Sequence, residues 1–300
     1  MIGYLDQNKW IELARIVHGK DRSAHSQAVL RAINAGSESG CMLPLSGVHY
    51  METARIANVR RRARLGAVMW KFSKGYTIAA YSTIVEHELE AALAKHFAHV
   101  KPHPFNFVGR GIAHAFGRAA TAVMPGRVND AMEEAMLTGC AGRAIDPLSF
   151  KGHTQRDNFR SHLEKLQKTK HELPKHKWED WLYAISVVDI LEPLSRVMSR
   201  HNLDKRDIEP LGAPFLTALV NDMPTRRVDV HLHRQVLRNS SYRPRKTDLE
   251  DWAGLAIASS YCDVVVCEKH MADMLKRDGF RARARIETSL PALFRTIRAA

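Results

Sequence analysis

The sequence predicts an α/β protein in which helices cover both faces of a parallel sheet. Strand patterns alternate with helical patterns over residues 1–90 and again over residues 240–300, whereas the stretch from about 90 to 240 carries mostly helical patterns. Alternating strands and helices form parallel sheets. We therefore expect one elaborated domain over 1–300, with a core from about 1–90 and 240–300 and a large helical insertion at about 90–240.

Three strands are expected near the N-terminus. Residues 2–5 form a short apolar run, and apolar residues recur at helical spacing from Trp10 onward. The run CMLPLS at 41–46 predicts a second strand, and Ser46 is placed to cap the helix that follows it. The run YTIAAYS at 76–82 predicts a third strand, which leads into a long helix.

Two further strands are expected near the C-terminus. The segment TDLEDWAGLAIASSY at 247–261 predicts a helix, and the β-branched run CDVVVCE at 262–268 predicts a strand. A short helix at 269–279 would end at Gly279, and ARARIE at 282–287 predicts the last strand. Strand and helix therefore alternate here as they do at the start of the chain.

The composition limits the class of protein. Hydrophobic residues make up 45% of the 300 residues and charged residues 26%, which is ordinary for a globular chain. No apolar run approaches the roughly 18–20 residues of a membrane-spanning helix, and no secretory leader is recognisable. The four cysteines form no Cys-x-x-Cys pair, which argues against a structural zinc site. We expect a cytoplasmic protein with no membrane partner.

The charge points to a polyanionic partner. A formal net charge of +13 attracts nucleic acid first, although anionic membranes and acidic proteins would satisfy it as well. A solvated helix face is the alternative explanation for any one basic cluster. The residues expected to contact nucleic acid are Arg60, Arg61, Arg62, Arg243, Arg245 and Lys246.

Carboxylates occur near the expected strand ends. Asp6 ends the first strand, Glu52 lies in the helix after the second, Asp248 and Asp251 begin a later helix, and Asp263 enters the following strand. Ligands of open parallel sheets bind beyond the carboxyl ends of the strands. If these acids converge, a cation would relieve their mutual repulsion, and an all-oxygen cluster suits Mg²⁺ or Mn²⁺.

Most of these acids also have a structural explanation. Thr247 and Glu250 match a capping box, so Asp248 could simply favour the positive N-terminus of its helix. Glu52 alone reads as an exposed helical residue, and Asp263 as a turn residue before a buried strand. Asp6 has no comparable structural explanation.

Three segments together resemble the PIN-like domain superfamily of metal-dependent nucleases: YLDQNKW, LSGVHYMETARI and TDLEDWAGLAIASSYCDVVVCEKHMADML. They lie at the two ends of the chain and leave the middle uncovered. The resemblance implies a three-layer α/β/α sandwich with a central parallel sheet. It also implies that clustered acids hold divalent metal for the cleavage of RNA.

The resemblance assigns roles to individual acids. Asp6 corresponds to the first acid, Glu52 to the helix acid and Asp251 to the third, with Asp248 as a supporting ligand. Asp263 falls where several members of the superfamily place an acid before the last core strand.

One position departs from the family pattern. Many members follow the last core strand with Thr-x-Asp, but this chain has Cys267, Glu268 and Lys269. Lys269 therefore stands where the last acid would be, which leaves the number of metals open. It would replace the charge of one cation or contact the scissile phosphate, and Asn8 would support a ligand or a water by hydrogen bonding.

The expected function is therefore that of a metal-dependent endoribonuclease. A toxin or a defence component is the biological role expected for such an enzyme. One alternative is a nucleic-acid-binding protein that keeps the fold without catalysis, and another is a phosphatase or nucleotide hydrolase. No P-loop is present, and His231 and His233 share a face only in a strand. A protein inhibitor or partner and self-association remain open.

Overall fold

The computed structural model describes residues 1–117, 129–139, 152–239, 241–245 and 248–293. The chain divides into two compact units. The first comprises residues 1–80, 107–152 and 253–300, and the second comprises residues 81–106 and 153–252. Residues 107–152, which lie inside the expected insertion, thus belong to the first unit.

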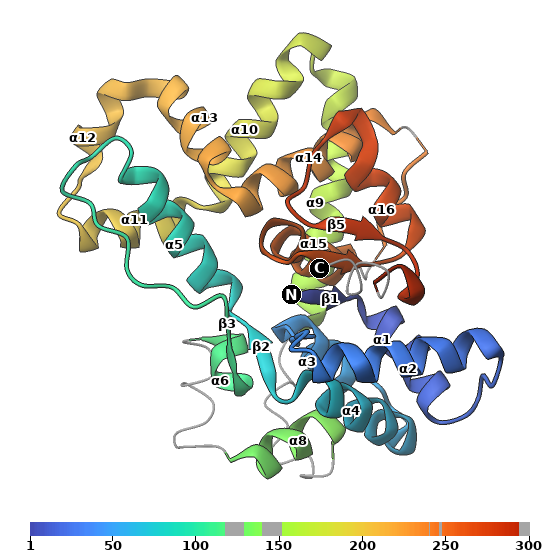
Figure 1. The fold of residues 1–300 in the computed structure, drawn as a ribbon. Helices are drawn as coiled ribbons and strands as arrows, with labels where there is room; N and C mark the ends of the chain where they lie inside the picture. The colour runs from blue at the N-terminus through green and yellow to red at the C-terminus, as the bar shows by residue number, and fades with distance from the viewer. Residues whose placement is uncertain (118–128, 140–151, 240, 246–247, 294–300) are drawn as a thin grey trace. The chain divides into compact units, whose positions relative to one another are not determined.

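A small parallel sheet forms the centre of the first unit (Figure 1). Its strands are β1 (Gly3–Leu5), β4 (Val264–Val266) and β5 (Arg285–Glu287), in the order β1-β4-β5. Both strand pairs are parallel, with Leu5 opposite Val266 and Val266 opposite Glu287. The two ends of the chain therefore share one sheet, and the protein is a mostly helical α/β chain.

The second expected strand, at 41–46, is not a strand in the structure. Met42 forms an isolated bridge with Ile2, and Leu45 forms one with Thr77. Pro44 lies between them and has no N–H group for a continuous ladder, so the segment changes partner there.

The third expected strand is β2 (Tyr76–Ile78), and it belongs to a separate sheet. It pairs antiparallel with β3 (Val108–Arg110), a strand in the region where the sequence predicts mostly helices. The short length of β3 explains why its pattern is weak, since three residues carry little periodicity.

Helices surround the parallel sheet in the first unit. The first of them, α1 (Gln7–Val17), follows β1 directly and buries Trp10 and Leu13 in the core. Gly66 allows close packing, because a Cβ there would lie 2.9 Å from the Cα of Thr138. The other helices are α2 (Ala24–Glu38), α3 (Gly47–Ala54), α4 (Val59–Ser73), α6 (Gly111–Phe116), α8 (Asp130–Thr138), α16 (Lys269–Lys276) and the 3₁₀ turn η4 (Arg277–Gly279).

Helices joined by loops make up the described residues of the second unit. The helical pattern over 178–200 forms two helices that meet at Ile190, and Pro193 occupies the first turn of the second one, where its missing N–H is tolerated. Its elements are α5 (Tyr81–Leu93), α9 (Gly152–Glu172), η2 (Lys175–Lys177), α10 (Trp178–Asp189), α11 (Leu191–Arg200), α12 (Lys205–Ile208), η3 (Glu209–Leu211), α13 (Gly212–Asp222) and α14 (Pro224–Arg238).

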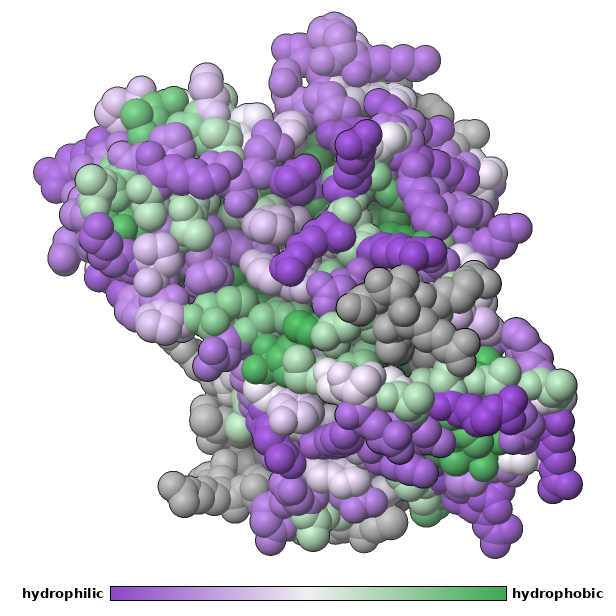
Figure 2. Space-filling model, viewed as in Figure 1, coloured by the Kyte–Doolittle hydropathy of each residue, from purple (hydrophilic) through white to green (hydrophobic). Residues whose placement is uncertain are grey.

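One helix, α15 (Asp248–Tyr261), begins in the second unit and ends in the first. Among the described helices, none is both long and apolar enough to cross a membrane. On the face drawn in Figure 2, hydrophilic residues cover much of the surface, and hydrophobic residues form smaller patches.

Candidate active site

Asp6 lies at the carboxyl edge of the parallel sheet. Its backbone N–H donates to the carbonyl of Val266 at 3.0 Å, and its own carbonyl accepts from Lys9 and Trp10 to start α1. The residue therefore ends the strand pairing and begins the helix. Only 8% of Asp6 is exposed, so the fold holds a carboxyl group in a largely buried position at the strand end.

Glu268 joins Asp6 at this edge. It follows β4 by two residues and is the N-cap of α16. Burial raises the pKa of Asp6 to about 6, against backbone N–H groups of Gln7 and Glu268 that lower it, and the charge of Glu268 raises it further. Two carboxyl groups thus repel each other where parallel strands end, which is an arrangement that a cation would stabilise.

Neighbouring polar groups fix the position of Glu268. The side-chain amide of Asn8 donates to one of its carboxylate oxygens, and His270 Nδ1 lies 3.2 Å from the other. Asn8 thus orients Glu268 by a hydrogen bond, and its support of a metal ligand stays a prediction.

A cleft of about 1020 Å³ lies beside Glu268 and Asn8. Its walls come from α1, from the start of α16 and from the end of β5, and they include Asn8, Lys9, Glu12, Arg15, Lys20, Glu268, Lys269, His270 and Thr288. The cleft therefore exposes Glu268 to a ligand and carries both acidic and basic groups.

Glu52 reaches the same neighbourhood from α3. It lines an adjoining cavity of about 410 Å³ together with Gln7 and Asn8. The next residue, Thr53, accepts a hydrogen bond from the Gln7 amide at 3.0 Å, which ties α3 to the start of α1. Burial raises the pKa of Tyr4 well above its usual range, and the charges of Asp6 and Glu52 both raise it further.

The three acids do not form one tight group. Asp6, Glu52 and Glu268 are described residues, and their ligand atoms are not all within 4.8 Å of one another. Direct ligation of one ion is therefore best suited to Asp6 and Glu268. Mg²⁺ usually keeps several waters, through which Glu52 could act.

His49 fixes the backbone just before Asp6. Its Nε2 lies 2.8 Å from the Leu5 carbonyl and its Nδ1 accepts from the backbone N–H of Ser46 at 2.9 Å. Complete burial lowers the pKa of His49 to about 4, so the ring is neutral and holds β1 to the start of α3. The sequence does not suggest the contact with Leu5, since it joins segments 44 residues apart.

Asp263 does not lie at this edge, so the structure does not bring it together with Asp6 as the sequence predicts. It precedes β4, and its carboxylate accepts the backbone N–H of Ile2 at 2.7 Å. Because β1 and β4 are parallel, Asp263 lies at the opposite end of the strands from Asp6. Three strand residues at about 3.3 Å each separate the two edges by about 10 Å.

Asp248 and Asp251 lie in the second unit, at the start of α15. Asp248 is fully buried and accepts hydrogen bonds from the Tyr242 hydroxyl at 2.6 Å and from the Arg245 backbone at 2.7 Å. Arg245 also lies 3.8 Å from Asp251. These contacts show a local structural role, and metal binding by either acid stays a prediction. Thr247, the expected cap, is outside the described residues.

The last acid of the edge is Glu268, one residue before the position that the family spacing indicates. Sequence comparison with Thr-x-Asp selects Lys269 and passes over this glutamate. A simpler feature of the sequence identifies this residue, because Glu268 is the first acid after the β-branched run of β4. Lys269 begins α16 and lines the cleft.

Basic residues extend the site along α1. A third cavity, of about 520 Å³, shares Ile11 with the other two and is lined by Arg15, His18, Lys20, Arg60, Arg61 and Arg64. We call these three neighbouring cavities together the α1 groove; Glu268 and Glu52 line two of them, and basic residues line the third. A nucleic-acid backbone would find phosphate contacts there.

Only some of the expected nucleic-acid contacts lie in this groove. Arg60 and Arg61 line it. Arg62 instead donates to the Met136 carbonyl at 2.7 Å and so holds α8. Arg243 donates to the carbonyl of its neighbour Tyr242, Arg245 pairs with the acids of α15, and Lys246 is outside the described residues.

Comparison with known proteins gives no match to a family model, a curated protein or a solved structure.

Proposed function

We propose that this chain is a divalent-metal-dependent nuclease that cleaves RNA, with Asp6 and Glu268 as direct metal ligands. The observation that carries the proposal is the meeting of these two carboxyl groups at the carboxyl edge of the sheet. Their chemistry suits Mg²⁺ or Mn²⁺, which prefer oxygen ligands. The resemblance of the two chain ends to PIN-like domains favours RNA and a three-layer α/β/α sandwich.

Each residue has a definable part in this reaction. Asp6 and Glu268 would hold the ion, Asn8 would keep Glu268 oriented, and Glu52 would accept hydrogen bonds from coordinated water. Bound Mg²⁺ or Mn²⁺ supplies a Lewis acid for a phosphate oxygen and acidifies a bound water. Arg15, Arg60 and Arg61 line the groove that would hold the flanking phosphates.

The shape of the surface favours a polymer over a small substrate. Besides the cavity that Glu268 lines, the α1 groove includes one lined by several basic residues. A nucleotide hydrolase would need no such extension. A cytoplasmic location is part of the same proposal.

The test is cleavage of labelled RNA by protein freed of contaminating nuclease, with Mn²⁺ and with EDTA. Asp6→Asn and Glu268→Gln should each reduce the cleavage rate at least about 100-fold, a change of about 2.7 kcal/mol in the activation barrier. RNA binding should change little, because the phosphate contacts remain. Asp273→Asn, on the exposed face of α16, is the matched control and should cleave normally.

Three results would redirect the proposal. Wild-type turnover in Asp6→Asn would exclude this site. RNA binding without cleavage would favour a binding protein of the same fold, and hydrolysis of nucleotides without cleavage of polymers would favour a nucleotide hydrolase.

A further inference from the structure

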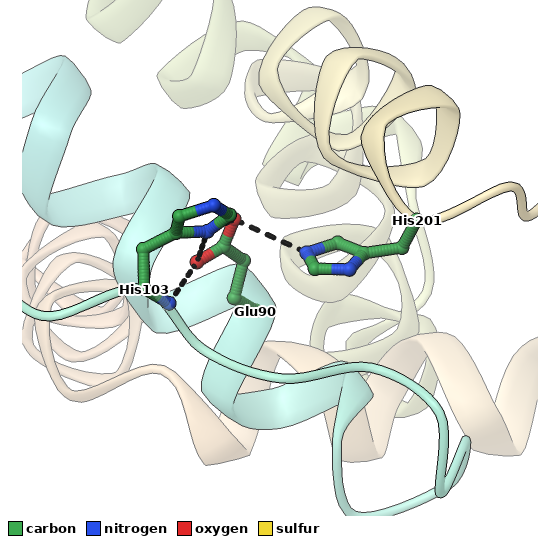
Figure 3. Close-up of side chains that lie close together, drawn as sticks. All are labelled: Glu90, His103 and His201. Atoms are coloured by element: carbon green, nitrogen blue, oxygen red, sulfur yellow. Dashed lines mark hydrogen bonds and ion pairs between the residues drawn. The ribbon is translucent and has the colours of Figure 1, made fainter.

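Three metal-ligating side chains meet in the second unit (Figure 3). Glu90 lies in the last turn of α5, His103 in the loop that follows, and His201 at the C-cap of α11. Their donor atoms all lie within 4.8 Å of one another. None of the three takes part in the proposed nuclease site.

The spacing of the donors fits a single small ion. His103 Nδ1 lies 2.8 Å from Glu90 Oε1, and His201 Nε2 lies 3.2 Å from the same oxygen. Zinc binds imidazole nitrogen and carboxylate oxygen at about 2.0–2.2 Å in tetrahedral geometry, so two of its ligands lie about 3.3 Å apart. The two nitrogen-to-oxygen distances, 2.8 and 3.2 Å, differ from that spacing by about 0.5 Å or less.

The negative charge of Glu90 also fits. Burial would raise the pKa of Glu90, but the backbone N–H of His103, the Arg200 guanidinium and His201 lower it to about 2. Glu90 is therefore ionised at neutral pH.

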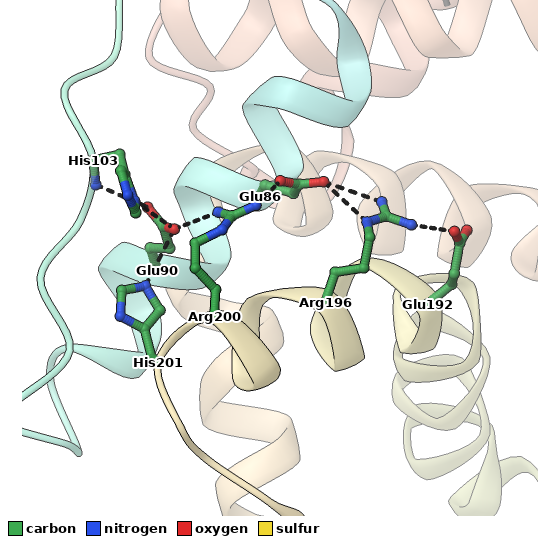
Figure 4. Close-up of polar contacts among 7 residues, drawn as sticks. All are labelled: Glu86, Glu90, His103, Glu192, Arg196, Arg200 and His201. Carbon is green, nitrogen blue, oxygen red and sulfur yellow. Dashed lines mark hydrogen bonds and ion pairs between the residues drawn. The ribbon is translucent and has the colours of Figure 1, made fainter. Parts of the chain in front are cut away.

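Outer contacts hold the carboxylate in place (Figure 4). Arg200 donates to Glu90 Oε1 at 2.6 Å and to Glu86 Oε2 at 2.7 Å, and the backbone N–H of His103 donates to Glu90 Oε2 at 2.8 Å. Arg196 lies 3.1 Å from Glu86 Oε1 and continues the network to Glu192. Metal-binding carboxylates are normally oriented by such hydrogen bonds.

Access remains on one side of the cluster. The His103 side chain is 61% exposed, whereas those of His201 and Glu90 are 11% and 2% exposed. A metal ion could enter from the His103 side and keep a water as its fourth ligand.

We propose that Glu90, His103 and His201 form a zinc site that ties the loop after α5 to the end of α11. The nitrogen ligands distinguish it from the all-oxygen edge, where Mg²⁺ or Mn²⁺ is favoured. Zinc-ligand spacing in the sequence does not reveal it, because each donor comes from a different segment.

The test is zinc titration of the metal-stripped full chain in excess Mg²⁺, which competes at the oxygen site and poorly at imidazole. Wild-type protein should bind one equivalent of zinc, and Co²⁺ in its place should give visible absorption bands of a tetrahedral site. Loss of outer contacts alone costs about 10–100-fold in metal affinity, so His103→Ala and His201→Ala should each cost about 100-fold or more.

Two further variants make the result decisive. His176→Ala, on an exposed turn of the same unit, should bind zinc like the wild type. His103→Cys should restore binding, because a thiolate also ligates zinc, and circular dichroism would check folding. Absence of zinc binding, or equal binding in His103→Ala and wild type, would overturn the proposal and leave the cluster as a set of hydrogen bonds.

Discussion

Burial of the Asp6 carboxyl group beside Glu268 has a consequence for stability as well as for metal binding. A folded-state pKa of about 6 means that the folded chain holds a proton which the unfolded chain releases near pH 4. The folded state therefore binds more protons than the unfolded state over this interval. Stability contributed by this group decreases as pH rises from about 4 to 6.

We expect Asp6→Asn to stabilise the metal-free protein at pH 8 by about 1–3 kcal/mol, because the buried charge is removed. Urea unfolding with EDTA measures the change. Saturating Mn²⁺ should then raise the unfolding free energy of the wild type and leave that of the variant nearly unchanged. A variant that is less stable than the wild type without metal would contradict this prediction.

His49 has the opposite pH dependence. Its pKa of about 4 lies below the ordinary value near 6.5. Between these two pH values the unfolded chain binds a proton at this histidine and the folded chain does not. The stabilising effect is complete above about pH 6.5 and is lost as pH falls through 4.

His49→Gln should lower the unfolding free energy at pH 8 by about 1–3 kcal/mol, since two buried backbone groups lose their partner. The difference between wild type and variant should shrink as pH is lowered from about 6.5 to 4. Urea unfolding across that range measures it, and a constant difference would show that the histidine does not titrate as described.

At the scale of elements, strand direction decides which acids can cooperate. The strand β4 has Asp263 before it and Glu268 after it, and only the second is at the edge where β1 ends. Sequence patterns locate β1 and β4 well, because each is an apolar or β-branched run, and the segment 282–287 also contains the strand β5. They locate Asp6 for the same reason.

The other features of the fold and the site depend on tertiary contacts, which sequence patterns do not reveal. Pro44 divides the segment 41–46 between two partners, which depends on tertiary pairing. The choice of Glu268 over Lys269 depends on how the chain turns from β4 into α16. Arg62 looks like its neighbours in the sequence, yet its contacts with α8 remove it from the groove.

Asp263→Asn provides a test at this scale. Its carboxylate only holds the backbone of Ile2 in the structure described here, so RNA cleavage should stay within about twofold while stability falls by about 1 kcal/mol. Cleavage assays and urea unfolding measure the two effects. A loss of activity like that of Glu268→Gln would place Asp263 back in the active site.

For the whole molecule, the net charge of +13 predicts salt-sensitive binding of nucleic acid. The charge alone does not say where the polymer lies. One substitution in the α1 groove and one elsewhere remove the same positive charge. Comparing them therefore separates a direct contact in the groove from the general positive field of the protein.

Arg61→Ala should weaken RNA binding and reduce the slope of log K against log salt by about 0.7, the value of one phosphate contact on a single strand. Lys205→Ala is the control, since Lys205 is 83% exposed in the second unit. Fluorescence anisotropy at several salt concentrations measures both slopes. Equal slopes for the two variants would argue against the α1 groove as the binding surface.

The most direct measurement is the anomalous scattering of a crystal soaked with Mn²⁺. We predict an anomalous peak at about 2.0–2.6 Å from carboxylate oxygens of both Asp6 and Glu268. Manganese bound elsewhere, with neither of these carboxylates among its ligands, would contradict the account.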